Sequence, residues 1–213
     1  MASKEFFSLI SAVIILTIVF SFSSALNSDW NQLSLILLFS TIIISLNILA
    51  KKITAHSLDT DVSHSIWDWS RYGLNPHSHL KNPIPIGTIL PIIISLFSLG
   101  IFKVPTILTY EARALKRRAA KRFGFYSYTE LTEWHNSLIG ASGIFVLLLL
   151  ALIAYLLPVN LELLAKMSAY YAFFNLLPIS NLDGTQIFFG SRILWTALST
   201  IALIFALYAL VLI

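Results

Sequence analysis

The chain has 213 residues, of which 57% are hydrophobic and only 11% are charged. A soluble domain carries about 25% charged residues, so the composition excludes a soluble domain and indicates a polytopic membrane protein. The chain contains no cysteine, which excludes disulfide bonds and thiolate metal sites. Its net charge of +4 does not indicate a nucleic-acid partner, because a nucleic-acid-binding domain would not need so apolar a chain.

Six apolar runs follow one another along the chain, each close to the ~20 residues that cross a bilayer. They cover residues 5–26, 33–50, 84–102, 137–157, 163–180 and 192–213. The first run, after Lys4 and ending in small residues at 23–25, leaves cleavage of a signal peptide as an alternative. It is longer than a usual signal, so we interpret it as a retained span.

The run at 84–102 differs from the others, because its prolines and glycine make a straight spanning helix unfavourable. These residues are Pro83, Pro85, Gly87 and Pro91. We expect this run to be re-entrant or interfacial, which leaves five spans. The predicted fold is therefore an all-α polytopic membrane protein that forms a single membrane domain over 1–213.

The distribution of Lys and Arg supports this topology, because cytoplasmic loops are rich in these residues. If 84–102 returns to the side it came from, regions 51–83 and 103–134 share one side, and with Lys4 and Arg192 this side holds 13 of the 14 basic residues. We expect a multi-pass protein of the cell membrane with the N-terminus and basic loops cytoplasmic and the C-terminus outside. The basic residues of the second region are Lys103, Arg113, Lys116, Arg117, Arg118, Lys121 and Arg122.

The most basic segment predicts a helix over 110–123, since Ala, Leu, Lys and Arg dominate it and Gly124 follows. Aromatic residues come directly afterwards, and basic residues beside aromatic ones are typical of a helix on an anionic membrane surface. The same mixture binds RNA, but no RNA-binding motif accompanies it. We therefore expect the lipid bilayer as a partner and no nucleic acid.

A polar, helix-breaking element ends the fifth run: Asn175-Leu-Leu-Pro178-Ile-Ser-Asn-Leu182-Asp183-Gly184. An ionisable group at membrane depth costs ~2.5–3.5 kcal/mol on insertion scales and usually has a function and a partner. Pro178 ends the helix, and Asp183-Gly184 follows where the backbone can bend.

This element resembles the N-x-x-P-x-x-x-L-D-G motif of the site-2 protease family, the intramembrane zinc metalloproteases, at all five fixed positions. The resemblance extends diffusely over 33–192 and includes a small-residue span that begins at 137–143. It implies a three-helix core, with a sheet-like or re-entrant element from 56–102 between the first two core helices. It also implies a cleft at Asn175, Pro178, Asp183 and Gly184.

In that family the aspartate is the third zinc ligand, and an H-E-x-x-H on an earlier helix provides two histidines and a general base. This chain contains no H-E-x-x-H. The corresponding helix end places Asn47 and Lys51 at the histidine positions and Ile48 at the glutamate position. Asparagine is a weak zinc ligand, isoleucine accepts no proton and an ammonium repels a cation, so catalytic zinc lacks its ligands.

The resemblance therefore implies a non-peptidase homologue with a vestigial site, no catalytic residue and no cofactor. Asp183 is the only residue that matches a family metal ligand. Lys51 lies one helical turn after Asn47, so we expect a Lys51–Asp183 ion pair with Asn47 hydrogen-bonded alongside. The alternative is that Lys51 extends to the membrane surface with Lys52. Asn175 is expected to cap backbone groups that Pro178 leaves free.

These features predict an inactive protein that binds or regulates membrane segments or partner proteins, and two alternatives stay open. One is an active zinc metalloprotease that combines Asp183 with His56 or His64. The other is a small transporter or channel, with Asp183 and Lys51 lining an aqueous path. The His77-x-His79 pair would also suit a metal on an extended strand, whereas His135 is interpreted as a polar residue at a helix start.

Overall fold

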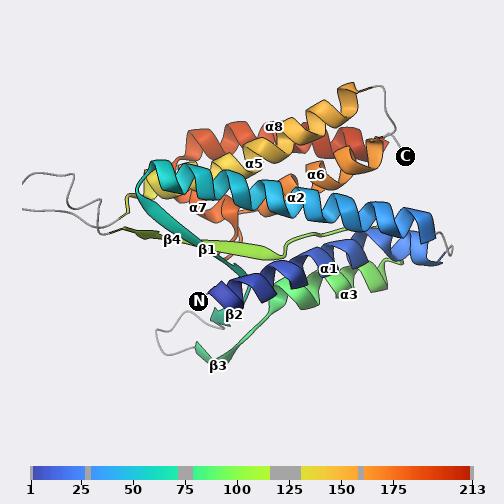
Figure 1. The fold of residues 1–213 in the computed structure, drawn as a ribbon, viewed down its shortest axis with the longest axis horizontal. Coiled ribbons are helices and arrows are strands. Elements are labelled where there is room, and N and C mark those ends of the chain that lie inside the picture. The colour runs from blue at the N-terminus through green and yellow to red at the C-terminus, as the bar shows by residue number, and fades with distance from the viewer. Residues whose placement is uncertain (1, 27–29, 72–78, 116–130, 158–160, 212–213) are drawn as a thin grey trace, which may run out of the picture.

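The computed structural model describes residues 2–26, 30–71, 79–115, 131–157 and 161–211 (Figure 1). This part of the chain is mostly helical and also contains two antiparallel pairs of strands. The helices are α1 (Ala2–Leu26), α2 (Trp30–Ser57), α3 (Ile86–Phe97), α5 (Glu133–Leu156), α6 (Glu162–Asn175), α7 (Asp183–Gly190) and α8 (Arg192–Val211). The strands are β1 (Thr60–Ile66), β2 (Trp69–Arg71), β3 (His79–Ile84) and β4 (Leu108–Ala114).

Four of the described helices, α1, α2, α5 and α8, are long and apolar enough to cross a membrane. The fifth predicted span is helical only over the 14 residues of α6, fewer than the ~20 of a full crossing. In Figure 1 these five helices run alternately in opposite directions along the long axis, and the two chain ends lie toward opposite ends of the bundle. The arrangement is a helical bundle of the kind expected for a membrane protein.

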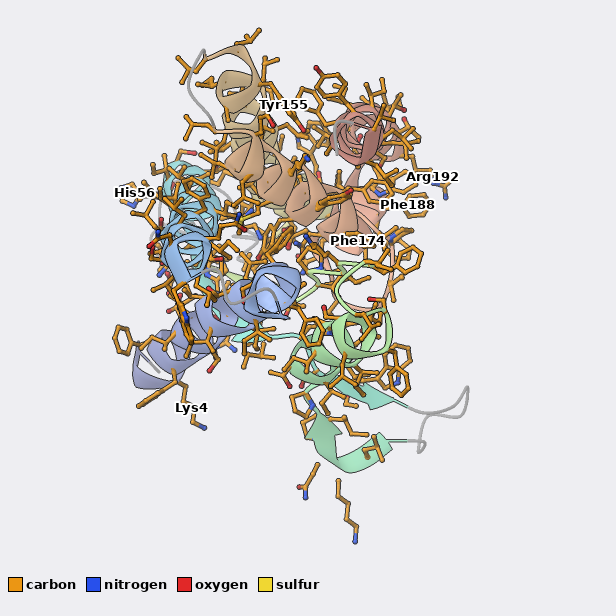
Figure 2. The ribbon with its side chains drawn as sticks, turned by 90° about the vertical axis from the view of Figure 1, so that its right-hand side faces the viewer. Lys4, His56, Tyr155, Phe174, Phe188 and Arg192 are labelled. Atoms are coloured by element: carbon orange, nitrogen blue, oxygen red, sulfur yellow. The ribbon has the colours of Figure 1, made fainter. Side chains whose placement is uncertain are left out.

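The prediction of an all-α fold is correct for the bundle but wrong for the region between α2 and α5. There β1 pairs with β4 and β2 pairs with β3, both antiparallel. The strands β1, β2 and β3 fall within 56–102, where the resemblance implies a sheet-like element, whereas β4 lies beyond that range. Seen along the long axis (Figure 2), α3 and the β2–β3 pair project from the side of α1, away from α5, α6 and α8.

The predicted helix over 110–123 is wrong where the structure describes it. Residues 108–114 form β4, in register with β1 from Thr60↔Ala114 to Ile66↔Leu108. The Ala- and Arg-rich composition favours a helix locally, but the backbone pairing with β1 and the burial of Leu108, Thr109 and Tyr110 outweigh that weak preference. Residues 116–123 lie outside the described part of the chain.

The run at 84–102 does not form a straight spanning helix. It contains α3, whose 12 residues reach about 18 Å, well short of a ~30 Å hydrocarbon core. The chain then reverses through Leu99 and Gly100, both at positive φ (52° and 80°), and returns through buried residues 105–107 to β4. The backbone N–H of Trp67, between β1 and β2, donates to the Ile107 carbonyl at 2.8 Å. This bond fixes the segment that returns from α3 against the chain that follows β1.

The folding back of the chain between β3 and β4 moves Lys103 away from the other basic residues of 103–134. Glu5 and Lys52 mark one end of the bundle, where they form an ion pair. Lys103 instead lies against Phe20, near the opposite end of α1, with 5.3 Å between its Nζ and the ring centroid. Its assignment to the same side as the basic loops is therefore wrong, because the charge count treated a folded-back segment as a loop outside the bundle.

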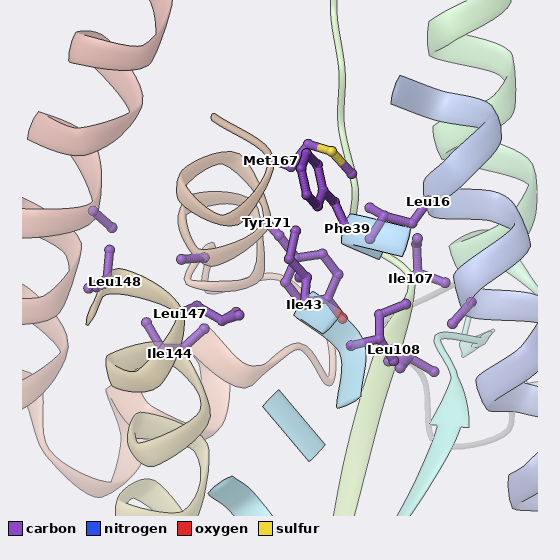
Figure 3. Close-up of a cluster of buried hydrophobic side chains, with 14 of the residues drawn as sticks. Leu16, Phe39, Ile43, Ile107, Leu108, Ile144, Leu147, Leu148, Met167 and Tyr171 are labelled. Atoms are coloured by element: carbon purple, nitrogen blue, oxygen red, sulfur yellow. The ribbon is translucent and has the colours of Figure 1, made fainter. Parts of the chain in front are cut away.

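The core lies where α1, α2, α5 and α6 meet. Figure 3 shows Leu16 of α1, Ile43 of α2 and Tyr171 of α6 converging on Ile107, just before β4, with Met167 above them. These five side chains are buried. The helix α8 contributes little to this core, since only 22% of its apolar stretch is buried. The packed centre therefore consists of α1, α2, α5 and α6, and α8 covers one side.

Candidate functional site

The predicted ion pair between α2 and α7 is present. The Lys51 Nζ lies 2.6 Å from the Asp183 Oδ2, and each side chain is only 2% exposed. Two opposite charges enclosed in this way form a charge-assisted hydrogen bond. If one of them is removed, no water can take its place beside the other. The alternative in which Lys51 extends to the surface with Lys52 is wrong, because only Lys52 is exposed.

The segment from 176 to 184 brings Asp183 back to the end of α6. Ser180 adopts a positive φ of 51°, and the Leu182 N–H donates to the Ile179 carbonyl at 3.2 Å, which closes the turn. A Cβ on Gly184 would lie 2.0 Å from the Leu176 carbonyl oxygen, so only glycine fits there. Asp183 is then the first residue of α7, where the helix dipole favours its negative charge.

Two glycines of α5 let this helix approach the ion pair. A Cβ on Gly143 would lie 2.7 Å from the Lys51 Cε and 2.8 Å from the Asn47 Nδ2. A Cβ on Gly140 would lie 2.6 Å from the Tyr110 hydroxyl. The small-residue span singled out in the sequence therefore has a definite role, since it makes the space in which the lysine side chain lies.

Tyr110 of β4 forms one wall of the site, and sequence reasoning did not find it. The Lys51 Nζ lies 4.7 Å from the centroid of its ring, a cation–π geometry. Its hydroxyl donates to the Asn136 carbonyl at 2.8 Å, and its own carbonyl accepts from the Gln186 Nε2 at 2.9 Å. Burial, and then the charge of Asp183, raise the pKa of the Tyr110 hydroxyl well above its usual value, so the ring remains neutral.

The two asparagines do not make the contacts predicted for them. Asn47 is buried, but its Nδ2 has no hydrogen-bond partner among the described residues, and neither has the second carboxylate oxygen of Asp183. Asn175 donates from Nδ2 to the Tyr171 carbonyl at 2.8 Å, and the Phe174 carbonyl, four residues before Pro178, accepts from the Leu177 N–H. Asn175 therefore bonds the preceding turn of α6 and does not cap a group freed by the proline.

A second polar cluster lies beside the first one. The Glu5 Oε1 of α1 accepts from the Lys52 Nζ at 2.9 Å and lies 3.3 Å from the His64 Nδ1 of β1. Burial, and then the charge of Lys51, lower the pKa of His64 to about 3, so this histidine is neutral near pH 7. The contact with Glu5 is then a hydrogen bond donated by Nδ1 rather than an ion pair.

The histidines considered as metal ligands do not gather around Asp183 in the described structure. His56 is exposed, His64 bonds Glu5, and the side chains of His77 and His79 lie outside the described part. Among the described residues there is no group of three or more His, Cys, Asp or Glu that could hold a metal ion. His135 lies at the start of α5, where its N–H donates to the capping Thr132, which confirms its interpretation as a helix-start residue.

A separate apolar pocket of about 440 Å³ lies between the end of α6 and the first half of α8. Of the four predicted cleft residues only Pro178 lines it, while Asn175, Asp183 and Gly184 are buried and do not line it. The Trp195 Nε1 donates to the Leu176 carbonyl at 2.9 Å and fixes the two helices at this point. The lining residues are Phe173, Leu176, Leu177, Pro178, Trp195, Thr196, Ser199, Thr200 and Leu203.

Aromatic and basic groups meet where α7 ends and α8 begins. Figure 2 labels Phe188 and Arg192 next to each other there, and the guanidinium carbon lies 5.7 Å from the ring centroid. The Phe188 ring also meets Trp195 edge-on at 5.2 Å. These contacts connect the turn that holds Asp183 to the helix that lines the pocket.

Comparison of the chain with protein-family models, with curated proteins and with solved structures found no match. The class of protein is therefore defined by the fold and the site alone. It is a mostly helical protein with a buried ion pair at one end of the bundle, and the four long apolar helices in the described part of the chain support a transmembrane location.

Proposed function

We propose that this protein is a catalytically inactive, site-2-protease-like integral membrane protein that binds membrane segments of partner proteins without cutting them. The observation that carries the proposal is the Lys51–Asp183 pair at 2.6 Å. In the motif that this chain resembles, the aspartate is a zinc ligand. Here an ammonium group of the chain itself occupies the position of the cation.

The surroundings of the pair support the absence of hydrolysis. Ile48, at the position of the general base, is buried and apolar. A base that activates a metal-bound water must accept a proton, and isoleucine has no group that does so. A lysine that already donates to Asp183 cannot serve as a metal ligand without losing its proton and its partner.

The pocket next to Pro178 supports the binding part of the proposal. Its ~440 Å³ falls within the ~300–1,000 Å³ of protein binding sites, and apolar side chains with a few hydroxyls line it. A membrane segment is apolar along its length and has few free polar groups, so it matches such a lining. In this proposal the protein lies in the cell membrane with its N-terminus and basic loops cytoplasmic, and neither zinc nor nucleic acid is needed.

The vestigial metal site is tested by rebuilding it. Asn47→His, Ile48→Glu and Lys51→His together create H-E-x-x-H on α2, with its second histidine at the position from which Lys51 contacts Asp183. We expect the purified triple variant to bind about one zinc ion per chain, and the wild type none, as measured by metal analysis. The matched control adds Asp183→Ala to the triple variant and is expected to lose the zinc.

Two outcomes would overturn the inactive assignment. The first is stoichiometric zinc in the wild-type protein. The second is chelator-sensitive cleavage of a membrane peptide by the wild type. A folded triple variant that binds no zinc would show instead that the α2–α7 geometry differs from that of the family, and the resemblance would lose its support.

Binding of membrane segments is tested by photocrosslinking from α8. The side chains of Leu203 and Ile204 are both exposed, but only Leu203 lines the pocket. A photoreactive phenylalanine analogue at position 203 is expected to crosslink uncut membrane proteins in native membranes, and the same analogue at 204 to crosslink mainly lipid. Equal crosslinking of proteins from both positions would contradict the pocket as the binding site.

A further inference from the structure

The large apolar side chains of α3 face outward. They are Ile89, Ile93, Leu96 and Phe97. The buried face of the same helix carries Gly87, Pro91 and Ser95, which follow one another at helical spacing. A helix at an aqueous surface has the opposite arrangement, with its large apolar side chains packed inward. Small residues at a helix contact are typical of packing inside a membrane, so α3 has the pattern of a helix that faces an apolar medium.

The reversal after α3, residues 98–102, continues this apolar surface. Its side chains Leu99, Ile101 and Phe102 are exposed, and Lys103, which follows them, is the first ionisable residue after Lys81. A contiguous exposed apolar surface marks contact with lipid or with another protein. The four long apolar helices of the described chain expose side chains of the same kind, and their length and composition indicate the bilayer as the surrounding medium.

The backbone of the reversal provides acceptors for its own N–H groups. The Ser98 N–H donates to the Ile94 carbonyl at 3.0 Å, and the Gly100 N–H donates to the Ser95 carbonyl at 2.8 Å. The Phe102 N–H donates to the Ser98 hydroxyl at 3.1 Å, and the N–H groups of residues 99 and 101 donate to carbonyls at 3.3 and 3.1 Å. A turn in water has no need of such complete pairing, whereas in hydrocarbon every backbone polar group must be satisfied by the protein.

The level of the reversal along the bundle follows from Lys103. Its Nζ lies 5.3 Å from the ring centroid of Phe20 on α1, the helix against which α3 packs. Phe20 is fifteen residues after Glu5, which is about 22 Å along the helix. Glu5 and Lys52 mark the other end of the bundle. Since a hydrocarbon core is ~30 Å thick, a point about 22 Å from the level of Glu5 lies beyond the midplane of the membrane.

We propose that the reversal after α3 is a lipid-binding surface, which inserts among the acyl chains of the leaflet opposite to the Glu5–Lys52 pair. The lipid that surrounds α1 at the level of Phe20 covers the reversal as well, because the two segments lie side by side there. The proposal rests on α1 crossing the membrane. It is independent of the Lys51–Asp183 site and of any binding in the pocket beside Pro178.

The chain contains no cysteine, so a single introduced cysteine can carry one nitroxide label in the full chain. Leu99→Cys and Ile101→Cys are labelled, reconstituted in liposomes of a neutral phospholipid, and exposed to oxygen, which dissolves in hydrocarbon, or to a nickel chelate, which remains in water. Collisions with oxygen are expected to exceed collisions with nickel as strongly as in Phe145→Cys, the lipid control on the exposed side of α5. Arg113→Cys on β4, an exposed position, is the water control and is expected to give the reverse ratio.

Two outcomes of this experiment would overturn the proposal. A ratio at both positions like that of Arg113→Cys would place the reversal at an aqueous surface. A strongly immobilised label that neither reagent reaches would show that protein, such as a second copy of the chain, covers the reversal.

A distance measurement tests the leaflet. The label at position 101 is combined with a second label in Ile18→Cys or in Ile10→Cys, both at exposed positions of α1. The distance from 101 to 18 is expected to be the shorter one, because Ile18 lies near the level of Phe20. The opposite order would place the reversal in the leaflet of Glu5 and contradict this part of the proposal.

Discussion

At one end of the helical bundle Lys51 lies 2.6 Å from Asp183 with 2% of its side chain exposed, whereas at the other end Lys103 is half-buried against Phe20 and is influenced by Lys166. The first lysine is enclosed by protein and is neutralised by a carboxylate from another helix. The second remains close to the surface, where the surrounding medium can neutralise it. The difference shows that a fully enclosed charge requires a partner within the chain, while a half-enclosed charge does not.

The largest expected effect tests this contrast directly. Lys51→Ala leaves the Asp183 carboxylate buried without its partner, so we expect a loss of ~3–5 kcal/mol in the free energy of unfolding. Lys103→Ala removes a half-exposed charge, and we expect a loss below ~1 kcal/mol. Both are measured by reversible unfolding in mixed micelles, and equal losses would remove the distinction between the two ends.

A double variant sharpens the same comparison. Replacing both members of a buried pair by apolar residues is often close to neutral. We therefore expect Lys51→Ala combined with Asp183→Leu to regain much of the stability that Lys51→Ala loses. If the losses of the two single variants simply add, the two side chains do not depend on each other.

The close approach of α5 gives the next effect. In Gly143→Ala the new methyl group lies where the Lys51 Cε and the Asn47 Nδ2 pass, at 2.7 and 2.8 Å, and Lys51 cannot move far while it bonds Asp183. Overpacking of this kind costs ~1–3 kcal/mol of unfolding free energy. Phe145→Leu on the exposed side of the same helix is the control, and an equal loss there would contradict the steric reason.

The third effect is on pH dependence. The pKa of His64 in the folded protein is about 3, below its ordinary 6.5, because of burial and Lys51. As the pH falls below 6.5 the unfolded chain takes up a proton that the folded chain does not, so stability is fully present above pH 6.5 and decreases below it. From pH 7 to pH 5 the wild type is expected to lose about 2 kcal/mol more than His64→Gln. Parallel pH profiles would show that His64 titrates normally.

The smallest effect concerns the lysine next to Lys51 in the sequence. Lys52 pairs with Glu5 at 2.9 Å, but its side chain is 46% exposed. Surface ion pairs contribute about 0–1 kcal/mol, so Lys52→Ala is expected to change the unfolding free energy by less than ~1 kcal/mol. A loss comparable to that of Lys51→Ala would mean that the Glu5 cluster supports the buried pair.

The sequence predicted the centre of the site because two local rules were sufficient. Helical spacing places Asn47 and Lys51 on one face, and the resemblance around Asp183 says which residue that face meets. The contacts of the two asparagines were predicted wrongly, since the direction of a buried amide depends on neighbours that sequence spacing does not specify. Asn175 bonds the preceding turn, and Asn47 has no partner for its Nδ2.

The rest of the site comes from segments whose place depends on the tertiary structure. Tyr110 reaches Lys51 only because β4 pairs with β1, whereas the local composition after residue 110 favours a helix. Glu5 meets His64 because α1 packs beside β1, and no motif connects these residues. The position of Lys103 follows from the reversal after α3, which charge counting along the chain does not include.

The buried pair of Lys51 and Asp183 has one more consequence. A cation that belongs to the polypeptide is present at fixed stoichiometry from the moment of synthesis, and neither dilution nor a competing chelator removes it. Formation of the Lys51–Asp183 pair therefore requires no metal ion, in contrast to sites whose contribution to folding comes from metal binding.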